Sequence, residues 1–160
     1  KLILSMAAAP DGMLWMGIFN HISFQGQVVG FDGTTTTTVN LNQIGYPSTF
    51  PYGVAQSHNN SPYVLLTGTS VRSVIRLDGT EKTELPLPLE LTGLRSLMID
   101  DDMLWVGGNA LGISDGFRTE VLPFALAGST ISAMVAQDSD HKWIGTADGG
   151  LVLLKRMATR

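Results

Sequence analysis

The sequence predicts an all-β chain assembled from four repeats of short strands, and three observations support this prediction. The triplet Trp-x-Gly occurs three times, at 15–17, 105–107 and 143–145. Asp-Gly pairs at 32–33, 78–79 and 115–116 separate apolar runs of strand length. The 18 glycines and 7 prolines interrupt the chain too often for long helices, and no apolar stripe of helical period persists for three turns.

The first regular feature of the repeat is a glycine with a large apolar residue two positions before it. The glycines are spaced by 51, 39 and 38 residues, and each follows a short apolar stretch and a polar turn. The aligned pairs are Trp15 and Gly17, Leu66 and Gly68, Trp105 and Gly107, and Trp143 and Gly145. Leu66 thus stands where the other repeats have tryptophan.

Each repeat is predicted to contain a strand, a polar turn, a second strand with Trp-x-Gly, a loop, a third strand, a turn and a fourth strand. The third repeat is the most compact, with "RSLMID", "DMLWVG", "ALGIS" and "FRTEVLPF" as its strands. We expect each Asp-Gly pair to form a type I′ turn, in which both central residues have positive φ.

Four strands within about 40 residues are typical of a β-propeller blade. The predicted blades are 1–50, 51–93, 94–128 and 129–160, the last of them incomplete because no fourth strand follows "GLVLLK". The tryptophans are expected to fill the space between neighbouring blades, and the glycines to permit close approach of the backbone. Three arrangements remain open: a piece of a seven- or eight-bladed propeller, two copies closing an eight-bladed ring, or a four-bladed ring.

Composition and charge narrow the range of functions. The 160 residues are enough for one domain, with 44% hydrophobic and 15% charged residues. A net charge of −4 disfavours nucleic acid or an anionic membrane as partner. The absence of cysteine excludes disulfides, thiol catalysis and cysteine-based zinc sites. The opening stretch "KLILSMAAA" is too short in its apolar part for a signal peptide and is expected to form a strand.

The sequence provides few candidate catalytic groups. None of His21, His58 and His141 has a second histidine or a carboxylate at metal-ligand spacing. The run 100–102 of three aspartates lacks the spacing of a calcium loop and is expected to be a solvated turn. No nucleophile or phosphate-binding motif is present. We therefore expect no catalytic residue, no metal and no cofactor.

Three stretches resemble the regulator-propeller repeat of the extracytoplasmic sensor regions of hybrid two-component systems. The best match to its pattern D-x-x-G-x-L-W-I-G-T-x-x-G-G-L is "DSDHKWIGTADGGLVLLK" at 138–155, followed by "APDGMLWMG" at 9–17 and "DDDMLWVGG" at 100–108. The second repeat departs from the pattern. The resemblance implies a non-catalytic sensor propeller, periplasmic or extracellular, with glycan fragments as ligands.

The loop that follows the second strand of each repeat is the expected place for a ligand. The residues assigned to it from the predicted topology are Asn20, His21, Arg72, Asn109 and Asp148. Two alternatives remain open: a propeller enzyme such as a lyase resembling the streptogramin-lyase group, and a scaffold that binds another protein. Further blades or a second chain are expected to complete the propeller.

Overall fold

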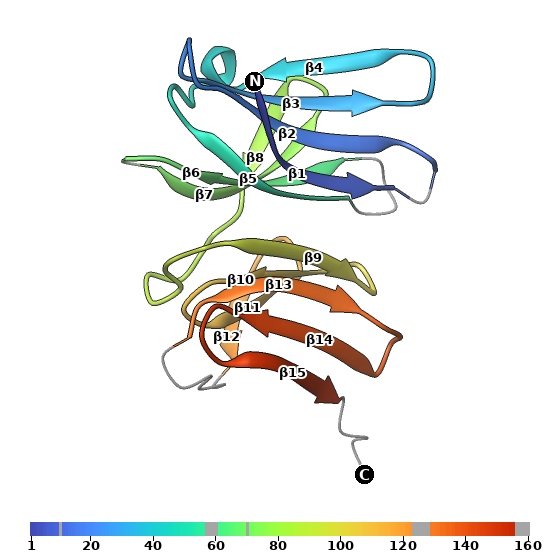
Figure 1. The fold of residues 1–160 in the computed structure, drawn as a ribbon, viewed down its shortest axis with the longest axis vertical. Coiled ribbons are helices and arrows are strands. Elements are labelled where there is room, and N and C mark those ends of the chain that lie inside the picture. The colour runs from blue at the N-terminus through green and yellow to red at the C-terminus, as the bar shows by residue number, and fades with distance from the viewer. Residues whose placement is uncertain (10, 57–60, 70, 123–128, 156–160) are drawn as a thin grey trace. The chain divides into compact units, whose positions relative to one another are not determined.

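The computed structural model describes residues 1–9, 11–56, 61–69, 71–122 and 129–155, and within them the chain forms fifteen β-strands and one short 3-10 helix (Figure 1). The strands form four antiparallel sheets, of which three have four strands and one has three. The chain divides into two compact units, 1–85 and 86–160, and each contains two sheets. The prediction of an all-β chain of four-stranded antiparallel sheets with almost no helix is confirmed.

The first unit contains two sheets whose strands follow one another in chain order. The first sheet has the order β1 (Leu2–Ala8), β2 (Leu14–Asn20), β3 (Gln25–Phe31) and β4 (Thr36–Asn40). The 3-10 helix η1 (Leu41–Ile44) follows it and ends at Gly45, whose φ of 91° requires glycine. The second sheet has the order β5 (Phe50–Gln56), β6 (Pro62–Thr67), β7 (Arg72–Asp78) and β8 (Glu81–Glu84).

The second unit repeats this arrangement. Its four-stranded sheet contains β9 (Ser96–Asp100), β10 (Met103–Gly107), β11 (Leu111–Ser114) and β12 (Thr119–Leu122). The other sheet has the order β13 (Ile131–Ala136), β14 (His141–Thr146) and β15 (Gly150–Lys155). The segment that carries the fourth repeat therefore contributes three strands within the described residues.

Alternating burial along β2 and β14 helps to place the cores. In β2, every second residue is buried, beginning with Trp15, which is 8% exposed. Trp15 packs in one apolar cluster with Val54 and Leu66 of the second sheet. In the second unit, Trp105 packs on the cluster of Leu111, Ile131 and Ile144. A pleated strand presents alternate residues to opposite faces, so Trp15 and Trp105 each face the sheet that follows in the chain.

The strand register corrects the alignment of the second repeat. Each of the pairs β1–β2, β5–β6 and β13–β14 has one irregularity near the start of its first strand. The residue of the second strand that pairs just after it is Gly17, Leu65 and Gly145 respectively. The counterpart of Trp15 and Trp143 in the second sheet is therefore Tyr63, not Leu66. The sequence alignment placed the repeat three residues too late because it followed Gly68.

The turns also differ from the type I′ prediction. Gly33, Gly79 and Gly116 have positive φ, but the aspartates before them do not. Asp32 and Asp115 instead accept backbone N–H groups from residues two and three positions later, which is the geometry of an Asx turn. The turn with positive φ at both central residues lies between β9 and β10, at Asp101 (48°) and Asp102 (60°).

Candidate functional site

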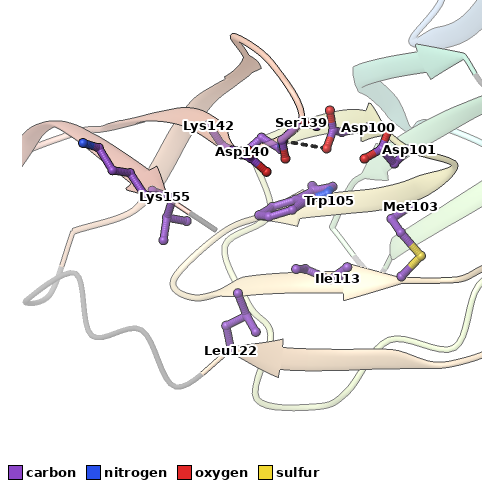
Figure 2. A pocket seen from close by; sticks show the side chains of 11 residues that line it. Asp100, Asp101, Met103, Trp105, Ile113, Leu122, Ser139, Asp140, Lys142 and Lys155 are labelled. Atoms are coloured by element: carbon purple, nitrogen blue, oxygen red, sulfur yellow. Dashed lines mark hydrogen bonds and ion pairs between the residues drawn. The ribbon is translucent and has the colours of Figure 1, made fainter. Parts of the chain in front are cut away.

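A cavity of about 480 Å³ lies in the second unit, lined by both of its sheets (Figure 2). Its apolar wall consists of Met103, Trp105, Ile113, Leu122 and Leu154. Its polar rim consists of Asp100, Asp101, Ser139, Asp140, Lys142 and Lys155. The cavity therefore combines one aromatic and apolar wall with a rim that is rich in carboxylates.

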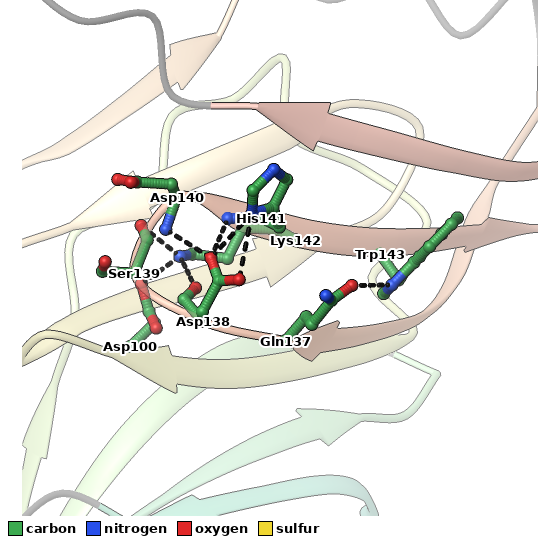
Figure 3. Close-up of polar contacts among 8 residues, drawn as sticks. All are labelled: Asp100, Gln137, Asp138, Ser139, Asp140, His141, Lys142 and Trp143. Atoms are coloured by element: carbon green, nitrogen blue, oxygen red, sulfur yellow. Dashed lines mark hydrogen bonds and ion pairs between the residues drawn. The ribbon is translucent and has the colours of Figure 1, made fainter.

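A buried ion pair joins the two hairpin turns at this rim. The Lys142 side chain is 5% exposed, and its Nζ lies 2.8 Å from Oδ2 of Asp100, whose side chain is 15% exposed. The same Nζ donates to the carbonyl oxygens of Asp138 and Ser139, each at 2.7 Å (Figure 3). All three ammonium protons of Lys142 therefore have acceptors. The pair fixes the 138–141 turn against the end of β9.

Asp138 shapes the turn that contributes Ser139 and Asp140 to the rim. Its Oδ1 accepts the backbone N–H groups of Asp140 at 2.9 Å and His141 at 2.8 Å, and also lies 2.8 Å from Nδ1 of His141. The His141 side chain, followed by the backbone donors, lowers the pKa of Asp138 below its ordinary value. An ionised Asp138 thus holds the turn, and His141 belongs to this local network.

Trp105 belongs to the apolar wall, and Figure 2 shows its ring among the labelled side chains that line the cavity. The indole N–H of Trp105 is buried without a protein acceptor, and so is that of Trp15 in the first unit. Because two tryptophans at the same repeat position share this feature, it reflects how the residue packs. In contrast, the indole N–H of Trp143 donates to Oε1 of Gln137 at 2.9 Å.

The residues predicted from sequence lie elsewhere, in loops at the opposite ends of the strands. Asn20 accepts the backbone N–H of Ile22 at 3.1 Å, and the neighbouring His21 is exposed. Arg72, at the start of β7, is also exposed. These residues belong to the first unit, whereas the other two belong to the second.

Asn109 and Asp148 are the predicted residues of the second unit. The Asn109 side chain accepts the backbone N–H of Thr92 at 2.6 Å and donates to the carbonyl of Glu90 at 3.1 Å, so it ties a loop together. Asp148 is exposed in the turn between β14 and β15. Neither of these residues lines the 480 Å³ cavity.

Sequence reasoning missed the cavity because its rim comes from turns that were interpreted as solvated. Asp101, Asp102 and Asp140 are indeed exposed, but Asp100 and Lys142 are not. The available signal was Lys142 itself, which occupies an inward-facing position next to Trp143 in β14. A buried lysine requires an acidic partner. In the preceding repeat, the aspartates before β10 occupy the turn equivalent to the one before Lys142.

The described residues contain no group of three histidine, aspartate or glutamate side chains placed to hold a metal ion. His58 lies outside those residues, so its environment is not described. In the same described part, no helix is long and apolar enough to cross a membrane. At the cavity, carboxylate groups can accept hydrogen bonds from a molecule that lies against the aromatic ring.

The fold defines a class of protein: a β-propeller built of antiparallel blades. A solved structure of YCF48 bound to a D1 peptide matches with a TM-score of 0.73 at 13% identity, over 98% of this chain and 51% of that one. YCF48 from Cyanidioschyzon merolae matches with a TM-score of 0.70 at 14% identity, over 96% of this chain and 50% of that one.

A second kind of neighbour is the extracellular domain of a hybrid two-component system from B. thetaiotaomicron. It matches with a TM-score of 0.72 at 19% identity, over 99% of this chain and 21% of that one. No protein-family model matches the chain, and no curated protein matches it in sequence. The chain spans about half the length of the YCF48 chains and about a fifth of that of the two-component domain, and the likeness establishes the propeller fold.

Proposed function

We propose that this chain is part of a non-catalytic, ligand-sensing β-propeller in the extracellular region of a two-component signalling protein. The ligand we propose is a glycan fragment, and its site is the cavity lined by Trp105. The observation that carries the proposal is this cavity, in which an indole ring and aliphatic side chains lie beside a polar rim of three aspartates, two lysines and a serine.

The volume and the chemistry of the cavity suit a sugar. About 480 Å³ lies within the range of roughly 300–1,000 Å³ that is typical of small-molecule sites. A pyranose has an apolar C–H face, which stacks on an aromatic ring, and hydroxyl groups, which donate to carboxylates. Asp101 and Asp140 are exposed acceptors at the rim. Lys142 has its protons engaged and serves to hold the rim in place.

Two findings support the sensor assignment. The repeat motif at 138–155 resembles the regulator-propeller repeat, and the fold is shared with an extracellular domain of a two-component system. An extracellular or periplasmic location follows from the proposal. A scaffold that binds a peptide is the second candidate, because a propeller of the same fold was solved as YCF48 bound to a D1 peptide.

The test is a thermal-shift and calorimetric screen of the 160-residue chain against a panel of oligosaccharides. We expect at least one of them to raise the melting temperature, since a ligand that binds only the folded chain stabilises it by mass action. Asp140→Asn is expected to weaken binding about tenfold, the effect of losing one hydrogen bond to a charged acceptor. The matched control is Asp148→Asn, an exposed aspartate of the same unit outside the cavity.

Three results would contradict the proposal. If Asp148→Asn abolishes binding and Asp140→Asn leaves it unchanged, the ligand binds at the loops predicted from sequence and not in the cavity. Binding of peptides without binding of any oligosaccharide would favour the scaffold. Cleavage of the same oligosaccharides during incubation would indicate that the protein is an enzyme and not a sensor.

A further inference from the structure

A second cavity, of about 240 Å³, adjoins the cavity at Trp105. The two cavities share Met103, Ile113 and Leu122 in their walls, so they are neighbouring parts of one depression in the second unit. All residues that line the second cavity lie between positions 103 and 122, on β10 to β12 and the turn that joins β11 to β12. Its walls therefore include no residue of the first unit and none of the strands at either end of the chain.

Strand pairing places the two cavities on one face of this sheet. Trp105 of β10 pairs with Ile113 of β11, and Ile113 pairs with Glu120 of β12. The side chains of residues that lie directly opposite each other in an antiparallel pair share one face. Neighbouring strands are about 4.8 Å apart, so Trp105 and Glu120 are separated by roughly 10 Å, with Ile113 between them. Figure 2 shows Trp105, Ile113 and Leu122 on three successive strands.

The polar side of the second cavity provides both a donor and an acceptor. Arg118 and Glu120 line it, and both are exposed. Among the described residues, neither side chain makes a hydrogen bond or a close ion pair. Asp115 instead accepts the backbone N–H groups of Phe117 at 2.8 Å and Arg118 at 2.7 Å, so its carboxylate belongs to the turn. The guanidinium of Arg118 and the carboxylate of Glu120 are therefore the groups that can bind a ligand here.

A sugar ring matches this combination of groups. A hydroxyl group both donates and accepts hydrogen bonds, so neighbouring hydroxyls of one ring can donate to Glu120 and accept from Arg118. The apolar C–H face of the ring can lie against Ile113 and Leu122, which removes apolar surface from water. The volume of about 240 Å³ is below the roughly 300–1,000 Å³ of a complete small-molecule site, so the second cavity has the size expected of a subsite.

The charges that line the two cavities favour an uncharged ligand. Three carboxylates and two lysines line the first cavity, and two carboxylates and one arginine line the second. The combined site therefore has two more negative than positive charges. One of its lysines, Lys142, already binds Asp100 and two carbonyl oxygens. A uronate would bring further carboxylates beside those of the site, whereas the hydroxyl groups of a neutral sugar add no charge.

We propose that the cavity at Trp105 is the first of two subsites, and that the second, formed by Ile113, Arg118 and Glu120, binds a further sugar ring. The ligand is then a neutral oligosaccharide of at least two rings, because the roughly 10 Å from Trp105 to Glu120 exceeds the width of one ring. This inference rests on the proposed function, since it takes the cavity at Trp105 to be the site of a glycan. It adds the length and the charge of the ligand, and two residues that determine specificity.

The test is isothermal titration calorimetry of the 160-residue chain with mono-, di- and trisaccharides of the glucan, mannan and xylan series. We expect at least one disaccharide to bind at least about tenfold more tightly than its monosaccharide, because the second ring adds hydrogen bonds to charged groups. Disaccharides of glucuronate and galacturonate are expected to bind more weakly than the neutral disaccharide.

Two variants separate the subsites. Glu120→Ala is expected to weaken disaccharide binding about tenfold and to leave monosaccharide binding unchanged, because it removes an acceptor of the second ring only. Asp140→Asn changes the first subsite and should weaken the binding of both saccharides to the same extent. The matched control is Glu90→Ala, which truncates an exposed glutamate of the same unit that lines neither cavity. Circular dichroism verifies that each variant is folded.

The outcomes distinguish the second subsite from the function on which it rests. If no saccharide binds, the proposed function is wrong, and the second subsite is wrong with it. If saccharides of one, two and three rings bind equally well, and Glu120→Ala has no effect while Asp140→Asn weakens binding, the second subsite is refuted and the first stands. Tighter binding of a uronate disaccharide than of the neutral one would refute the assignment of a neutral ligand.

Discussion

Replacing Lys142 by methionine tests whether the rim of the cavity depends on the buried ion pair. The substitution keeps the apolar stem of the side chain but leaves the Asp100 carboxylate, only 15% exposed, without its partner 2.8 Å away. Removing one member of a buried pair costs about 3–5 kcal/mol, and we expect about 3 kcal/mol because Asp100 retains some access to water. The two carbonyls that Lys142 also binds belong to exposed turn residues, which water can solvate.

The assay is urea unfolding followed by tryptophan fluorescence. With a slope of about 1–3 kcal/mol per molar urea, a loss of about 3 kcal/mol lowers the midpoint by roughly 1–3 M. The double variant Lys142→Met with Asp100→Asn removes the unpaired carboxylate and should recover at least about 1 kcal/mol of the lost free energy of unfolding. Lys155→Met, at an exposed residue of the same cavity, should change stability by less than about 0.5 kcal/mol. If Lys142→Met is as mild as Lys155→Met, the pair does not hold the two turns together.

Two further predictions concern the first unit. Asp32 accepts four hydrogen bonds from Thr34 and Thr35, and these bonds hold the pKa of its carboxyl group well below the ordinary 3.8. The ionised Asp32 therefore stabilises the fold above pH 3.8, and this contribution is lost as the pH falls. Asp32→Ala should therefore lower the urea midpoint at pH 7 more than at about pH 2.5, and an equal effect at both would refute the charge-based account. Gly17→Ala forces a Cβ against the Pro51 carbonyl and should cost about 1–3 kcal/mol. Gly68→Ala meets only contacts of 3.4 Å or longer and is its matched control, so equal costs would show that the close approach of Pro51 does not require glycine at position 17.

The fold could be predicted because its signals are local and recur. Apolar runs of strand length, glycine-rich turns and the Trp-x-Gly triplet each report on one strand or one turn, and their period fixes the class of repeat. The second repeat was misaligned because its strand β6 has Tyr63 and Leu65 where the others have tryptophan and glycine. The alignment took Gly68 for the glycine of Trp-x-Gly, and only the strand pairing in the structure showed the correct register.

The candidate site could not be predicted in the same way, because it depends on contacts between repeats. Asp100 and Lys142 are 42 positions apart in the sequence, in different sheets. Each looks like an ordinary turn residue or strand residue when read within its own repeat. Their pairing follows only after the two sheets are packed with the hairpins side by side. Topology alone instead drew attention to Asn109, whose side chain ties its loop to the backbone of Glu90 and Thr92.

The tryptophan of Trp-x-Gly has different surroundings in the three sheets that contain it. Trp15 is 8% exposed because the following sheet packs over it, so there the motif supplies core. Trp105 packs on the following sheet and also lines the cavity at whose rim Lys142 joins the two sheets. Trp143 occupies the same strand position and pairs with Val135 and Leu153 of its own sheet. The residue type and register are constant across the three sites, so a difference in function among them must come from neighbouring sheets and not from the motif itself.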